Sequence, residues 1–144
     1  MYKELVSELT RENRWVKIQP PCSENAINNA EKEVGYAFPG ELRALLLEMN
    51  GDSYLLLSVE EIVEQTRLNR KIQAEYSDEE FANELDKFIF FAGNGCGDYY
   101  CYHADSDGAV DETAIYIWEH EESSWKPVAS GIAELITRYY HDEI

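Results

Sequence analysis

The chain has 144 residues, of which 44% are hydrophobic, so it is long and apolar enough to close one domain around a core. Its formal net charge is −17, because 29 Asp and Glu oppose 12 Lys and Arg. Such a charge argues against direct binding to nucleic acid or to membrane surfaces, and it favours basic partners. An acidic surface that serves solubility alone is the alternative interpretation.

The three cysteines make an odd number, which excludes a complete disulfide framework. Residues 1–20 carry charges throughout and lack the apolar stretch of a signal peptide. We therefore expect a protein of the reducing cytoplasm.

The first third of the chain predicts three helices. Residues 1–12 place apolar side chains at helical spacing, which indicates an amphipathic helix. Ser23 is the expected N-cap of a second helix that Gly35 ends. A third helix is expected between the turn at Phe38-Pro39-Gly40 and the pair Asn50-Gly51, whose residues tolerate positive φ.

Residues 55–57 form a short candidate strand. Ser58 and Glu61 have the spacing of a capping box, which predicts a helix over about residues 59–74. The same spacing recurs further on and predicts a short helix over residues 77–85.

The second half changes to aromatic, β-favouring runs separated by turn residues. The predicted strands cover residues 88–92, 99–102, 114–118 and 125–128. Ser130 then opens a terminal helix. N-terminal helices, a run of strands and a C-terminal helix predict an α+β fold with a largely antiparallel sheet flanked by helices. We expect a single domain over residues 1–144.

The acidic residues are concentrated after residue 50, where 21 acids face six bases. No Lys or Arg occurs between Lys87 and Lys126. That stretch holds eight acids: Asp98, Asp105, Asp107, Asp111, Glu112, Glu119, Glu121 and Glu122. Because they lie mostly in predicted turns, we expect an acidic loop rim that binds a protein partner. Trp118 is a candidate aromatic anchor beside it, and packing in the core is the alternative.

Four residues have side chains that bind zinc: Cys96, Cys101, His103 and His120. Their spacing lies at the edge of structural zinc patterns, so no metal site is predicted. Cys96 in the glycine-rich turn at residues 93–97 is also a poor nucleophile, because the neighbouring Asp98 raises a thiol pKa. We predict no catalytic residue and no cofactor.

Several groups of residues, taken together, resemble a known family. They are Ala30-Glu31, Val34-Gly35, Phe38-Pro39, Leu45-Leu46, Met49-Asn50-Gly51, Phe90-Phe91-Ala92-Gly93-Asn94-Gly95, Gly97-Asp98 and Ile115 to Glu121. Their order and spacing over residues 24–140 resemble the SUKH superfamily. Asp52 stands where many members have a second glycine, so we expect a differently shaped loop there.

The resemblance implies an α+β fold and a non-catalytic binding function. Bacterial members are mostly immunity proteins that neutralise polymorphic toxins, often nucleases or deaminases, whereas eukaryotic members are regulatory adaptors, which is the alternative here. A nuclease must bind phosphates, so a basic toxin domain agrees with the charge of this chain. We expect a monomer or a homodimer, since an antiparallel sheet can leave an edge strand open.

Overall fold

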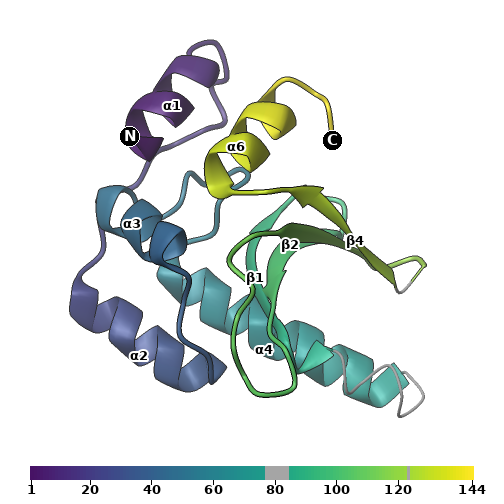
Figure 1. Cartoon of the computed structure of the whole chain (residues 1–144). Coiled ribbons are helices and arrows are strands. Elements are labelled where there is room, and N and C mark those ends of the chain that lie inside the picture. Colours follow the sequence, from purple (N-terminus) through teal and green to yellow (C-terminus); the bar gives the residue numbers. More distant parts are fainter. Residues whose placement is uncertain (77–84, 123) are drawn as a thin grey trace.

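The computed structural model describes residues 1–76, 85–122 and 124–144, and Figure 1 shows the arrangement. The elements in chain order are α1 (Tyr2–Leu9), α2 (Glu24–Val34), α3 (Gly40–Glu48), α4 (Val59–Tyr76), β1 (Phe88–Gly93), β2 (Tyr99–His103), β3 (Ile115–Glu119), β4 (Ser124–Ala129) and α6 (Ile132–Tyr140). This order confirms the predicted α+β fold. Among the described helices, none is long and apolar enough to cross a membrane.

The four strands form one antiparallel sheet in the order β1-β2-β3-β4, so each strand pairs with its neighbours in sequence. Helices α1, α2, α3 and α6 lie to one side of this sheet, with α1 packed against α6, whereas α4 packs along β1 and extends past it (Figure 1). The β3–β4 hairpin points away from α2 and α3 (Figure 1). The main core lies between these helices and one face of the sheet, where Phe91, Tyr100 and Tyr102 are buried. A smaller cluster with Phe88, Phe90, Cys101 and Trp118 covers the other face.

Helix ends that depend on local hydrogen bonds follow the sequence signals. The Ser23 hydroxyl accepts from the Ala26 N–H at 3.1 Å, and Gly35 ends α2 at φ 92°. The capping box of α4 is complete, because the Glu61 N–H donates to the Ser58 hydroxyl at 3.2 Å and the Ser58 N–H donates to the Glu61 carboxylate at 2.9 Å.

Several predicted boundaries differ from the structure. Helix α1 ends at Leu9 rather than at residue 12. The C-cap of α3 is Met49 in an extended conformation, and Gly51 takes its positive φ two residues later. The predicted strand at 55–57 is reduced to a single bridge from Leu56. Residues 77–84 of the predicted short helix lie outside the described part of the chain.

The N-cap of α6 is Gly131 rather than Ser130. The Ser130 N–H and hydroxyl both donate to the Glu134 carboxylate, at 2.8 and 2.6 Å. The carboxylate of Glu41 accepts from the Ile132 N–H at 3.3 Å, so a residue from α3 satisfies the first turn of α6.

Both edges of the sheet are protected against pairing with another strand. Along β1, the Thr66 hydroxyl accepts from the Phe90 N–H at 3.1 Å and donates to the Phe90 carbonyl at 3.5 Å. Along β4, Pro127 has no N–H to donate, and the Arg138 guanidinium donates to the Val128 carbonyl.

Asp52 organises the loop before α4. Its side chain is fully buried, and one carboxylate oxygen accepts from the N–H groups of Tyr54, Leu55 and Leu56 at 2.9, 2.8 and 2.8 Å. The other oxygen accepts from the Tyr140 hydroxyl at 2.6 Å. The carboxylate therefore ties this loop to α6 at the position where the family resemblance expects glycine.

Candidate functional site

The eight predicted acids lie at two opposite ends of the sheet. In an antiparallel sheet, the β1–β2 and β3–β4 turns share one end and the β2–β3 loop lies at the other. We call residues 94–98 and 119–122 the turn end and residues 104–114 the loop end. A five-residue strand separates them by about 17 Å. The acids of the predicted loop rim are therefore divided between two surfaces: the turn end holds Asp98, Glu119, Glu121 and Glu122, and the loop end holds Asp105, Asp107, Asp111 and Glu112.

Acids at the loop end mainly hold their own backbone in place. The Asp105 carboxylate accepts from the N–H groups of Asp107 and Ala109 at 2.9 and 3.0 Å. Asp111 accepts from both the hydroxyl and the N–H of Thr113, and these hydrogen bonds lower the pKa of the Asp111 carboxyl. Asp107 is exposed. These bonds are typical of turns that fix a loop.

Glu112 attaches the loop end to α3. Its carboxylate accepts from the Gly40 N–H at 2.9 Å, at a helix start where the N-cap Pro39 offers no side-chain acceptor. A carboxylate at a helix N-terminus also interacts favourably with the helix dipole. Glu112 therefore stabilises the fold, which makes it a weaker candidate for partner binding.

The two turns of the turn end are locked together by Asp98. Its carboxylate accepts from the His120 N–H at 3.1 Å and lies 2.8 Å from His120 Nδ1, and the Asn94 amide donates to it at 3.4 Å. Partial burial alone would raise the pKa of Asp98, but the bonds from His120 and Asn94 bring that pKa below its ordinary value. Gly97 has φ 96°, and a Cβ there would lie 2.8 Å from the His120 ring. The Asp98 carboxylate therefore joins the β1–β2 turn to residue 120 of the β3–β4 turn.

The remaining acids of the turn end face solvent to different degrees. Glu119 pairs with Lys126 across the hairpin, with oxygen and nitrogen 3.1 Å apart. Glu121 and Glu122 are exposed. Trp118 is only 2% exposed and packs with Phe88, so the suggestion that it is an exposed anchor is wrong. Its side chain belongs to the core because it shares the face of β3 that the second cluster covers.

Two other aromatic side chains are exposed beside the turn end, and the sequence analysis missed both. Trp15 is 64% exposed and Tyr54 is 46% exposed. They line a hollow of about 680 Å³ together with Tyr139, Asn94 and others, which we call the aromatic hollow. Asn94 belongs to both surfaces, so the hollow and the turn end are continuous. One signal was available: Trp15 follows the apolar stripe of the first helix and stands among charged residues.

Contacts among the lining residues and with Asp52 hold the aromatic hollow in shape. The rings of Tyr54 and Tyr140 stack with centroids 6.1 Å apart, and the Tyr140 hydroxyl donates to buried Asp52. The Arg14 guanidinium lies 4.9 Å from the centroid of the Trp15 ring. This contact shows that the exposed Trp15 ring accommodates a cationic group on its face.

Cys101 and Cys96 lie in different surroundings. Cys101 is buried, and this burial raises the pKa of its thiol well above the ordinary value, so the thiol stays protonated. Cys96 is exposed in the turn, where its N–H donates to the Asn94 side chain. His120 directs Nδ1 to Asp98. Within the described residues, no group of three or more His, Cys, Asp or Glu side chains is arranged to hold a metal ion.

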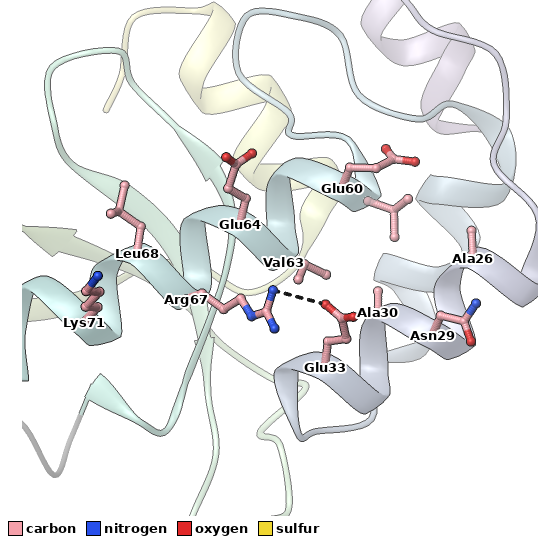
Figure 2. A pocket seen from close by; sticks show the side chains of 11 residues that line it. Ala26, Asn29, Ala30, Glu33, Glu60, Val63, Glu64, Arg67, Leu68 and Lys71 are labelled. Atoms are coloured by element: carbon pink, nitrogen blue, oxygen red, sulfur yellow. Dashed lines mark ion pairs between the residues drawn. The ribbon is translucent and has the colours of Figure 1, made fainter.

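A second hollow lies between α2 and α4 and is shown in Figure 2. Its volume is about 720 Å³, and Ala30 from α2 and Val63 from α4 lie at its centre. At its margin, Arg67 and Glu33 form an ion pair with nitrogen and oxygen 3.5 Å apart (Figure 2). It opens on the helical side of the molecule and contains none of the predicted acids.

The comparison with known proteins agrees with the fold. No curated protein shows significant similarity to the chain. A family model, described as the SMI1 / KNR4 family (SUKH-1), matches residues 21–138, from just before α2 into α6. This match covers most of the chain and confirms the resemblance to the SUKH superfamily that the motifs indicate. The chain therefore belongs to the SMI1 / KNR4 family (SUKH-1).

Proposed function

We propose that this protein is an immunity protein that binds and neutralises a cognate toxin with a basic surface, such as a nuclease. The family is generally non-catalytic, and the bacterial SUKH proteins that the chain resembles are mostly immunity proteins. The observation that carries the proposal is the continuity of exposed aromatic rings with exposed acids at one end of a strongly acidic molecule.

The two kinds of side chain have different parts in binding. Exposed Trp and Tyr side chains supply most of the energy in many interfaces, because each buries a large area at small entropic cost. Trp15 and Tyr54 are the candidate anchors. Exposed acids add less affinity but attract a basic partner and speed its association. Glu121 and Glu122 are the candidate steering groups.

Hydrogen bonds within the molecule support the same assignment. The bonds of Asp98 to His120 and of Asp52 to Tyr140 fix the turn and the hollow before any partner binds. A preformed surface loses less conformational entropy on binding than a flexible one. Fast association with a preformed surface suits a protein that must intercept a toxin before damage occurs.

The test starts with the protein encoded by the neighbouring gene, because an immunity gene stands beside a toxin gene. Co-expression should rescue cells from that protein, and the purified pair should form a complex. Capture of a host regulatory protein without rescue would instead support the adaptor function.

Kinetic measurements then locate the interface. Trp15→Ala should weaken binding by about 2 kcal/mol, mainly through faster dissociation. Glu121→Lys should slow association about threefold or more at low salt and flatten its salt dependence. Asp107→Lys at the loop end changes net charge equally and is the matched control, with a smaller expected effect. Equal effects of the two charge reversals would remove the turn end as the binding surface.

A further inference from the structure

Four charged side chains form a straight stripe on α4. They are Glu60, Glu64, Arg67 and Lys71, all exposed. Spacings of four, three and four residues keep them on one side of a helix with 3.6 residues per turn. The opposite side of α4 is buried, as Ile62 and Thr66 show. Figure 2 shows the four residues in this order along α4, beside the hollow shared with α2.

The order of charge along the stripe is negative, negative, positive, positive. Within one helix this order places like charges four residues apart twice, in Glu60 with Glu64 and in Arg67 with Lys71. The central pair of the stripe, Glu64 with Arg67, joins opposite charges three residues apart. The helix dipole favours acids only in the first turn, so it accounts for Glu60 and not for the others. The stripe is, however, complementary to itself when a second copy lies antiparallel to it.

A two-fold axis near the middle of the stripe would place Glu60 opposite Lys71 and Glu64 opposite Arg67 of the second copy. The symmetry makes each pairing occur twice, so four ion pairs form in one isologous contact. The existing pair of Arg67 with Glu33 does not prevent this, because both side chains are more than half exposed and such pairs are weak.

Other features of the chain favour this face over the rest of the surface. Two copies with a net charge of −17 repel each other, and this repulsion is least where bases are dense. Three of the 12 bases lie within residues 67–71. Leu68, which is 45% exposed, lies beside the stripe and would lose contact with water. The sheet edges are closed to pairing by Thr66 along β1 and by Pro127 along β4.

We propose that two copies of this chain associate through the exposed stripe of α4, antiparallel, with the acidic half of each stripe against the basic half of the other. This association does not depend on the identity of any toxin.

Sedimentation equilibrium over a range of protein concentrations tests the proposal. The wild-type protein should show a monomer–dimer equilibrium at low salt, and its dimer dissociation constant should rise about tenfold or more at high salt. A wild-type protein that stays monomeric at low salt and millimolar concentration would overturn the proposal.

Charge exchange gives the specific test. The variant Glu60→Lys with Glu64→Lys and the variant Arg67→Glu with Lys71→Glu should each be monomeric, because each stripe then carries charges of one sign. Their equimolar mixture should form a heterodimer. The control Glu121→Lys with Glu122→Lys changes net charge as the first variant does and should keep the dimer. If either stripe variant dimerises like wild type, or the mixture stays monomeric, the contact is not the stripe. Circular dichroism verifies the fold of each variant, and the wild-type salt dependence provides a test free of substitutions.

Discussion

Removing the hydroxyl of Tyr140 should destabilise the protein by about 2 kcal/mol, since hydrogen bonds to charged groups contribute about 1.5–3 kcal/mol. The hydroxyl donates to the buried carboxylate of Asp52 over 2.6 Å. In Tyr140→Phe, one carboxylate oxygen loses this donor where water does not reach it. For a domain of this size, the melting temperature should fall by about 6 °C.

Urea unfolding followed by circular dichroism measures the change. Tyr139→Phe is the matched control, because Tyr139 packs in the same aromatic cluster and its hydroxyl has no hydrogen bond within the described residues. The control should change the free energy of unfolding by less than about 0.5 kcal/mol. Asp52→Ala should cost more than Tyr140→Phe, about 4 kcal/mol, because it leaves three backbone N–H groups without their acceptor. Equal losses for Tyr140→Phe and Tyr139→Phe would refute this account of the Asp52 loop.

The hydrogen bond from Tyr140 to Asp52 also predicts an effect of alkaline pH on the free energy of unfolding. Burial first, and the Asp52 charge second, raise the pKa of Tyr140 above its ordinary value of 10.0. A group whose pKa is raised in the folded state contributes stability that is complete below its unfolded pKa. This contribution is lost as the pH rises from the unfolded pKa through the folded pKa. The difference in stability between wild type and Tyr140→Phe should therefore be constant near neutral pH and shrink above about pH 10. Urea unfolding at several pH values measures it.

Three further substitutions test local features, each by urea unfolding. Ser58→Ala removes half of the capping box with Glu61 and should cost about 1 kcal/mol; no loss would mean that the box contributes nothing. Gly97→Ala forces a side chain into positive φ and against the His120 ring, so a loss of about 1–3 kcal/mol is expected, and a neutral result would show that the turn yields easily. Burial acts to raise the pKa of Asp98, but its bonds to His120 and Asn94 bring that pKa below its ordinary value. The contribution of Asp98 to stability is therefore present above its unfolded pKa and is lost as the pH falls through the folded pKa. Asp98→Asn should therefore flatten the acid limb of the stability profile below about pH 4, and an unchanged limb would contradict the assignment.

The parts of the fold that the sequence predicts well are those fixed by neighbouring residues. The capping box at Ser58 and the N-cap at Ser23 satisfy backbone groups three residues away, so sequence spacing is sufficient to find them. The start of α6 is different. Its first turn is satisfied by Glu41 from α3, 91 residues away, and no local pattern predicts that partner.

The distribution of acids shows a related limit. Sequence shows that the stretch between Lys87 and Lys126 lacks bases, and the structure places all of its acids in or beside turns. Which turns meet depends on the number of strands between them. Asp98 and Asp105 are separated by the single strand β2, so they must lie at opposite ends of the sheet. Asp98 and His120 are separated by two strands, so their turns meet.

The exposed aromatic pair illustrates how one unusual residue can shape a candidate binding surface. The Asp52 side chain accepts the Tyr54 N–H and thereby fixes the loop that presents Tyr54. The Asp52 carbonyl accepts the Lys17 N–H at 2.8 Å and thereby holds the segment that presents Trp15. Many members of the SUKH superfamily have glycine at this position, and glycine has no side chain to make the first contact. Any residue at this position supplies the carbonyl, so only the placement of Tyr54 depends on a side chain that departs from the family pattern. Such departures are where we expect partner specificity to be encoded.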